Sequence, residues 1–186
     1  VAGLSGGAIF TISQNNISVS NCDFYKNKAT INGGGAVYVS INGRISIDQS
    51  TFTENEGQFG GAILNSLNVI TKVNRSVFTL CDADYGGAIY TNDNSMLEVD
   101  SSSFLQNTGI YGAAIHFDNN ADFTASSCTF SENNASGPGG AIFTGSNIDA
   151  NLTDCIFSAN NADNGHTVWV DNNSDFSFVR CRFENN

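Results

Sequence analysis

The chain has 186 residues and a formal net charge of −11, with 18 Asp and Glu against seven Lys and Arg. So few cations argue against a nucleic-acid partner, which requires clustered Lys and Arg. No run of about 18 apolar residues occurs, so the sequence predicts no membrane-spanning segment. We expect the acidity to keep a surface protein soluble rather than to form a specific site.

Seven copies of a two-part repeat fill the chain. The first part is a Gly-Gly-Ala-Ile-aromatic block at 6–10, 34–38, 86–90 and 139–143, with a Leu variant at 60–64 and looser copies at 112–116 and 165–169. The second part is Phe-x-x-Asn, whose Phe always lies 18 residues after the first position of the block. The period is 26 residues in four of six steps, and 28 and 27 in the others. Such a fixed period is typical of a solenoid.

The order of residues within each unit predicts short strands. Counting the first Gly as position 0, positions 3, 13 and 18 are almost always apolar, whereas positions 12 and 17 are mostly polar. Apolar residues two apart with polar residues between them are the pattern of a strand. Abundant Gly, Asn, Ser, Thr and Asp disfavour helix, and all length changes fall between the Phe and the next Gly, where the only proline, Pro138, stands.

These observations predict an all-β protein, a single-stranded parallel β-helix (solenoid) of seven coils of about 26 residues, with three strands in each coil. Stacked coils bury one continuous core. The invariant Phe of position 18 is expected to form a stack in that core. Its members are Phe24, Phe52, Phe78, Phe104, Phe130, Phe157 and Phe183.

The Asn of the second block recurs at position 21, where a strand meets a turn. Asn tolerates left-handed backbone and its amide can satisfy turn groups, so stacked copies predict a structural Asn ladder. Its members are Asn27, Asn55, Asn107, Asn133, Asn160 and Asn186. Cys81 stands at this position in the third coil and is expected to break the ladder once.

The two interlocked blocks resemble the polymorphic outer membrane protein repeat of chlamydial and many other microbial surface proteins. The resemblance covers the whole chain. It implies a right-handed β-helix, an extracellular or cell-surface location and an adhesive or structural role, and it supplies no catalytic residues. We expect 1–186 to be one β-helix repeat domain, either a segment of a longer chain or a filament subunit, because no polar cap is visible at either end.

Five cysteines occur, and four of them share position 16 with Ser: Cys22, Cys128, Cys155 and Cys181. We favour free, buried thiols that act as small apolar side chains. A disulfide framework is the alternative, although three stacked neighbours cannot all pair with one another. With two His and no Cys-x-x-Cys, a Cys/His metal site is not expected.

Position 4 of the first block is aromatic in most coils. If the Ile of position 3 points inward, position 4 points outward and forms an aromatic stripe that could contact sugars or a partner protein. In the alternative, the row is buried beside the Ala of position 2. We favour the first arrangement, because an exposed Ile row has no evident use. The stripe comprises Phe10, Tyr38, Leu64, Tyr90, His116, Phe143 and Trp169.

Polar sites remain at the corners. Five Asn-x-Ser/Thr sequons are possible N-glycosylation sites on a secreted protein: Asn16, Asn74, Asn134, Asn151 and Asn172. The corners Asn92-Asp93-Asn94, Asp118-Asn119-Asn120 and Asp171-Asn172-Asn173 offer oxygen ligands for Ca²⁺. Ordinary turn chemistry explains them more simply, so no metal and no other cofactor is expected.

The sequence therefore favours an extracellular structural or adhesive module that associates end to end, or with other surface proteins or glycans. The alternative is a carbohydrate-binding or polysaccharide-degrading β-helix protein. Such an enzyme needs paired carboxylates in a groove, whereas Asp and Glu are scattered over the corners here, so no catalytic residue and no enzymatic activity are expected. Ice binding would need a column of Thr, which position 5 does not provide.

Overall fold

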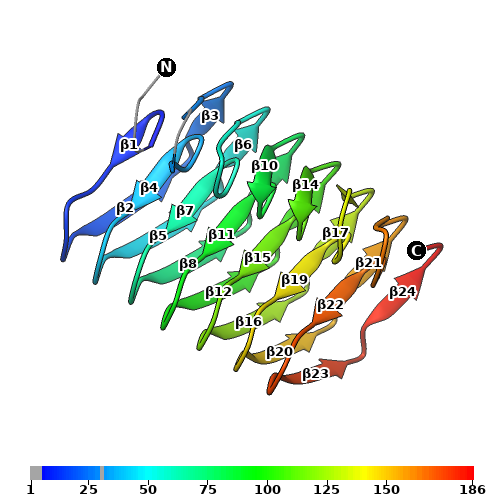
Figure 1. Ribbon diagram of the computed structural model, residues 1–186. Helices are drawn as coiled ribbons and strands as arrows, with labels where there is room; N and C mark the ends of the chain where they lie inside the picture. Colours follow the sequence, from blue (N-terminus) through cyan, green and yellow to red (C-terminus); the bar gives the residue numbers. More distant parts are fainter. Residues whose placement is uncertain (1–5, 30–31) are drawn as a thin grey trace.

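The computed structural model describes residues 6–29 and 32–186. Its described residues form strands and turns without any helix, and the chain winds through seven coils into a parallel β-helix (Figure 1). The predicted fold class is confirmed. Among the described residues, no helix has the length and apolar character that crossing a membrane requires.

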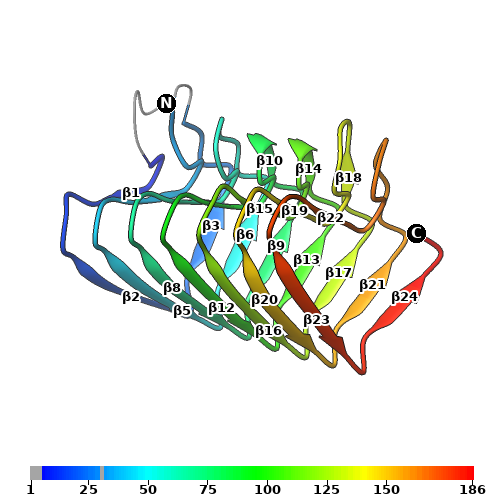
Figure 2. The same cartoon turned by 60° about the horizontal axis from the view of Figure 1, so that its bottom comes forward.

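Three seven-stranded parallel sheets surround the core (Figure 2). Sheet 1 consists of β1 (Ile9–Phe10), β4 (Val37–Val39), β7 (Ile63–Asn65), β11 (Ile89–Thr91), β15 (Ile115–Phe117), β19 (Ile142–Thr144) and β22 (Val168–Val170). Sheet 2 consists of β2 (Asn16–Ser20), β5 (Arg44–Asp48), β8 (Ile70–Asn74), β12 (Met96–Asp100), β16 (Asp122–Ser126), β20 (Asp149–Thr153) and β23 (Asp175–Val179). Sheet 3 consists of β3 (Asp23–Tyr25), β6 (Thr51–Thr53), β9 (Val77–Thr79), β13 (Ser103–Leu105), β17 (Thr129–Ser131), β21 (Ile156–Ser158) and β24 (Arg182–Glu184).

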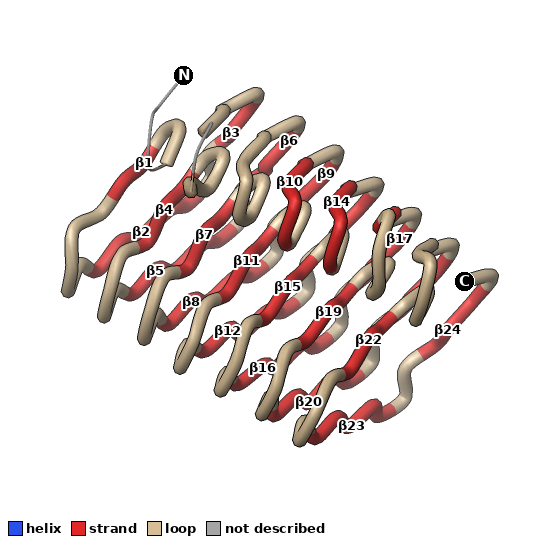
Figure 3. The backbone as a smooth tube through the Cα atoms, viewed as in Figure 1, coloured by secondary structure: helices blue, strands red, loops and turns tan. Residues whose placement is uncertain are grey.

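A fourth, shorter sheet lies in the loops that join sheet 3 to the next coil's sheet 1. This side sheet contains β10 (Asp82–Tyr85), β14 (Thr108–Tyr111) and β18 (Asn134–Ala135). Its strands project beside sheet 1 in Figure 3. The loops of variable length predicted from the sequence therefore contain paired strands in three of the coils.

Each coil turns its corners with left-handed residues that are not glycine. Positions 8, 15 and 20 have positive φ in every coil, as at Asn94, Ser101 and Gln106, with φ of 54°, 49° and 54°. The bend after sheet 3 therefore lies one residue before the Asn of position 21, which itself is not left-handed. This corrects the expectation that the Asn backbone makes the turn: its contribution comes from the side chain.

The Asn side chains bind one coil to the next. Asn107 Nδ2 donates to the carbonyl oxygen of Phe78 at 3.1 Å and to Asn133 Oδ1 at 2.9 Å. Asn133 Oδ1 also accepts the backbone N–H of Asn107 at 3.1 Å, and Asn133 repeats the pattern with Asn160. Because these amides are buried, each hydrogen bond fixes the vertical register of two coils.

Cys81 takes the place of Asn in the third coil and keeps part of the pattern. Its backbone N–H donates to Asn107 Oδ1 at 3.0 Å, and its thiol donates to the carbonyl oxygen of Phe52 at 3.5 Å. Burial raises the pKa of this thiol to about 11, so it stays protonated and able to donate. Cys81 therefore keeps a weaker donor to the preceding coil, but it has no amide oxygen to accept from Asn55, so the Asn–Asn ladder is interrupted once, as predicted.

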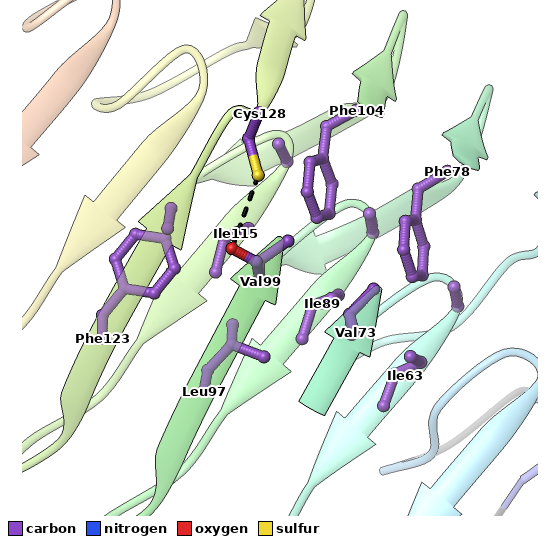
Figure 4. Close-up of a cluster of buried hydrophobic side chains, with 14 of the residues drawn as sticks. Ile63, Val73, Phe78, Ile89, Leu97, Val99, Phe104, Ile115, Phe123 and Cys128 are labelled. Carbon is purple, nitrogen blue, oxygen red and sulfur yellow. Dashed lines mark hydrogen bonds between the residues drawn. The ribbon is translucent and has the colours of Figure 1, made fainter. Parts of the chain in front are cut away.

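The Phe column forms the centre of the core. Neighbouring rings from Phe24 to Phe183 lie 4.6 to 4.9 Å apart between centroids, with interplanar angles of 1° to 7°. Strand pairing places Phe52, Phe78 and Phe104 directly over one another. Figure 4 shows Phe78 and Phe104 beside Ile63, Ile89 and Ile115 of sheet 1. Full burial of one such side chain stabilises a fold by about 1.5–3 kcal/mol.

The Ser and Cys residues of position 16 form another column. Ser occupies this position in the second, third and fourth coils, where the hydroxyl of Ser76 accepts the N–H of Ser50 at 3.1 Å and donates to the carbonyl of Asn74 at 2.8 Å. In the last three coils a thiol replaces the hydroxyl. The Cys128 thiol donates to the carbonyl oxygen of Val99, as Figure 4 shows, and also lies within hydrogen-bond distance of the carbonyl oxygen of Ser126. All five cysteines are free thiols here.

The thiols differ in exposure. Cys81, Cys128 and Cys155 are buried, Cys181 is half-buried and Cys22 is exposed. Cys22 therefore departs from the expected burial, because it lies in the first coil, where no described coil precedes it.

Alkylation of the folded protein should modify Cys22 first and Cys181 more slowly, while the three buried thiols react only after unfolding. Burial raises the pKa of Cys81, and hydrogen bonding to Cys155 together with burial raises that of Cys128, so both stay protonated. The same hydrogen bond lowers the pKa of Cys155 to about 7, so this thiol is protected by its burial and not by its protonation state. Intact mass after native and denaturing alkylation without reductant measures both classes. Three or more thiols that stay blocked after denaturation would instead indicate disulfides.

Replacement of Cys81 by Asn should complete the Asn ladder and raise the free energy of unfolding by about 1 kcal/mol, the net value of one or two additional hydrogen bonds. Cys81→Ala should lower it by about 1–3 kcal/mol, because the Phe52 carbonyl loses its donor. Urea unfolding followed by circular dichroism measures both. The ladder interpretation fails if the Asn variant is no more stable than the Ala variant.

Candidate functional site

The outer face of sheet 1 carries the aromatic row predicted from the sequence, here called the outward column (Phe10, Tyr38, Leu64, Tyr90, His116, Phe143 and Trp169). The Ile and Val residues of position 3 pack into the core, so position 4 points away from it. Exposure is uneven along the column. Phe10 is 50% exposed and Trp169 37%, whereas Leu64 and Tyr90 are 6% and His116 3% exposed.

A second set of rings, the lid column, covers the middle of the outward column. It consists of Phe59, Tyr85 and Tyr111, which directly precede Gly60, Gly86 and Gly112. Their rings stack at 5.2 and 5.3 Å, and strand pairing in the side sheet holds them in register. Phe59 lies 5.0 Å from Tyr90, and Tyr85 lies edge-on to His116 at 5.3 Å.

The lid column corrects the expectation of a continuous exposed stripe. The row faces outward, as favoured, but Tyr90 and His116 are covered by rings from the loops, and Leu64 is nearly buried beneath the neighbouring side chains. The sequence contains a signal for this cover, since three consecutive coils place an aromatic residue immediately before the first Gly. The repeat blocks did not predict this cover, because the three aromatic residues lie in the loops of variable length outside both blocks.

The carboxylate of Asp118 borders this aromatic cluster. Tyr90 Oη donates to Asp118 Oδ2, and His116 Nε2 lies 3.3 Å from Asp118 Oδ1. Burial and the hydrogen bond to Asp118 raise the pKa of Tyr90. Burial acts to raise the pKa of Asp118, but hydrogen bonds from His116 and Tyr90 outweigh it and hold that pKa below its ordinary value of 3.8. Asp118 is therefore an ionised anchor for both rings.

The outward column has one gap. Leu64 is its only aliphatic member, and a depression of about 140 Å³ opens there, lined by Asn32, Tyr38, Phe59, Leu64, Ser66, Tyr90 and Asn92. We call it the ring gap. It combines aromatic walls with a hydroxyl and carboxamides, and no lining residue carries a charge.

The outer face of sheet 2 holds three further depressions, which together form the sheet 2 groove. One of them, of about 480 Å³, runs across β8, β12, β16 and β20 between Lys72 and Thr153. Depressions of about 250 Å³ flank it, one beside Arg44 and one beside Asp149 and Asp175. The groove follows the axis of the helix because equivalent outward residues of successive coils form its two walls.

The two carboxylates of the 480 Å³ depression, Glu98 and Asp100, are already engaged. Glu98 pairs with Lys72 at 2.6 Å. Hydrogen bonds from Ser126 and Ser101 lower the pKa of Asp100. A general acid for glycoside hydrolysis requires the opposite shift. The groove can offer hydrogen bonds to an extended polar ligand, and Asp100 is poorly suited to donate a proton.

The five sequon asparagines lie on the surface of different faces. Asn16, Asn134, Asn151 and Asn172 are exposed, and Asn74 is half-buried in the sheet 2 groove. The side-chain oxygen of Asn74 has no hydrogen-bond partner among the described residues. Four of the five positions therefore leave room for a glycan on the folded domain.

The carboxylate-rich corners make turn contacts. Asn119 Nδ2 donates to Asp93 Oδ1 at 3.2 Å, and Asp171 Oδ1 accepts the N–H of Asn172 at 2.8 Å. Within residues 6–29 and 32–186, no group of three or more His, Cys, Asp or Glu residues is arranged to hold a metal ion. The side chains of these corners bind the backbone N–H of the adjacent residue or a corner side chain of the neighbouring coil.

The chain belongs to the right-handed β-helix family. The model of that family, described as a right-handed β-helix region, matches residues 1–183. Searches of curated proteins and of solved structures gave no significant match. The family fixes the fold and its hand, and function has to be argued from the surfaces.

Asp118→Asn should lower the free energy of unfolding by about 1 kcal/mol at neutral pH, because it weakens two charge-assisted hydrogen bonds at a partly exposed site. Asp118 has a lowered pKa in the folded state, so its contribution is present above pH 3.8 and disappears as the pH falls through the folded-state value. Urea unfolding of both proteins between pH 7 and strongly acidic pH should show the difference shrinking. The exposed Asp84, whose side chain has no hydrogen bond among the described residues, provides the control Asp84→Asn, expected to have little effect.

Proposed function

We propose that this chain is an extracellular structural and adhesive module of a microbial surface protein, built from repeats of the polymorphic outer membrane protein type. The observation that carries the proposal is an outward aromatic face on a rod whose coils are locked together by buried ladders. Tyr38 and Phe143 present partly exposed rings on this face, with coils on both sides of them. Exposed aromatic groups on a rigid support are typical of interaction surfaces.

The remaining surface supports the same role. Exposed sequons suit a secreted glycoprotein, and the acidity suits a soluble surface module. Strands β22, β23 and β24 pair on one side only within the described stack, which would allow end-to-end association into a filament. The same edges would equally accept further coils of a longer chain.

A carbohydrate-binding or polysaccharide-degrading role is the second candidate, and the sheet 2 groove is the observation that favours it. We propose binding without catalysis there, because Glu98 is ion-paired and the pKa of Asp100 is lowered. Release of reducing ends from acidic or neutral polysaccharides, abolished by Asp100→Asn, would establish the enzymatic alternative.

Adhesion can be tested with beads coated with the domain and exposed to immobilised glycans and matrix proteins. Tyr38→Ser should reduce bead retention several-fold, because it removes a central ring of the exposed part of the outward column. Tyr25→Ser is the matched control: Tyr25 is 57% exposed on sheet 3, away from the aromatic face. Circular dichroism should show both variants folded. A monodisperse monomer that is retained on no surface, and forms no fibres in electron micrographs, would contradict the proposal.

A further inference from the structure

The outward column lacks a ring in one coil, and the space left beside Leu64 has about the size of one ring. Above the gap, Phe10 and Tyr38 lie 5.2 Å apart between centroids. Below it, Tyr90 and His116 lie 5.3 Å apart, and His116 and Phe143 4.7 Å. Between Tyr38 and Tyr90 stands Leu64, paired to both by strand register.

Because successive coils are about 4.8 Å apart, Tyr38 and Tyr90, which lie two coils apart, are separated by about twice that distance. The shorter Leu64 side chain forms the floor between them, and the ring of Phe59 closes one side. A single flat or chair-shaped ring inserted over Leu64 would continue the stack. The depression of about 140 Å³ is smaller than the ~300–1,000 Å³ of a drug-sized site, so it suits one ring rather than a larger ligand.

The two sides of the ring gap differ in chemistry. The walls are the rings of Tyr38, Phe59 and Tyr90, whereas Ser66 and Asn92 stand at the rim. Asn92 Oδ1 accepts the N–H of Asp93 at 2.8 Å, and its amide N–H₂ remains available as a hydrogen-bond donor. Neither that amide group nor the Ser66 hydroxyl has a hydrogen-bond partner among the described residues, and no lining residue is charged.

We propose that the ring gap binds one neutral pyranose ring of a glycan, with the C–H groups of the sugar against the part-exposed rings of Tyr38 and Phe59 and its hydroxyl edge toward Ser66 and Asn92. This inference rests on the proposed adhesive function and names its ligand class. A pyranose has both an apolar face and a polar edge, so it satisfies both sides of the gap. A Phe side chain of a partner protein would bury the rim groups without a hydrogen bond, which is costly, and a Tyr or Trp side chain offers only one polar group, fewer than the several hydroxyls of a pyranose.

The direct test is saturation-transfer NMR with three glycosides: methyl β-D-glucopyranoside, methyl β-D-galactopyranoside and methyl α-D-mannopyranoside. At least one should receive saturation at its ring C–H protons, with a dissociation constant on the order of 1 mM, as expected for so small a ligand. Leu64→Phe should abolish the signal, because it fills the gap with the ring type that the column carries elsewhere. Asn92→Ala should weaken binding about tenfold through the lost hydrogen bond.

Leu105→Phe is the matched control. Leu105 is a half-buried residue of β13 on sheet 3, so it undergoes the same chemical change away from the gap and should leave binding intact. If Leu64→Phe does not fold, as judged by circular dichroism and thermal unfolding, Asn92→Ala and Tyr38→Leu carry the test. 4-Methylphenol, an analogue of a tyrosine side chain, serves as the competing probe.

Three results would overturn the assignment: no saturation of any glycoside, glycoside binding that survives Leu64→Phe in a folded protein, or binding of 4-methylphenol alone. These outcomes are separable from failure of the adhesive function. Beads whose retention depends on Tyr38 but not on Leu64→Phe, together with absent glycoside binding, would leave the adhesive surface standing and remove the sugar from the ring gap.

Discussion

The structure depends on the near-exact superposition of successive coils, which places like residues over like residues. The Phe column measures this superposition directly, since interplanar angles of 7° or less allow almost no rotation from one coil to the next. Sheets of this breadth are usually twisted, and flat ones require stacking or side-chain ladders to hold them. Here the buried Asn and Ser columns provide such ladders, because each amide or hydroxyl bonds to the coil before or after it.

Superposition makes each position of the repeat a property of its column rather than of one residue. An Asn at position 21 is useful because the preceding coil offers a carbonyl oxygen and the next coil an amide oxygen as acceptors, and an isolated Asn would be an unsatisfied buried group. Cys81 shows how far the requirement relaxes: a thiol preserves one donor to the preceding coil. The left-handed corners at positions 8, 15 and 20 accept Arg, Leu and Ala as well as Asn, so ladders and core packing outweigh the local backbone cost there.

The sequence predicted the column positions well, because period and alternation are local signals. The Phe stack and the pairing of equivalent positions follow from spacing alone, as seen for Phe78 and Phe104, whereas alternation left two arrangements of the Ile row open. It could not predict the lid column. Phe59 and Tyr85 lie in loops of variable length, and their contact with Tyr90 depends on how those loops fold back over sheet 1. Exposure of Cys22 likewise depends on its place in the stack rather than on its position in the repeat.

The same reasoning explains where specificity can arise in so regular a fold. In a column of identical side chains, each side chain packs against the next. Such a column stabilises the fold but leaves little space in which a ligand could be recognised. A smaller residue in one coil leaves a space whose walls are set by the coils above and below, as Leu64 does between Tyr38 and Tyr90. The ladders keep those walls at a fixed separation, so the site is preorganised without any residue dedicated to supporting it. Variation at a single rung can therefore create a binding site on a β-helix while the buried columns, and the fold they specify, stay unchanged.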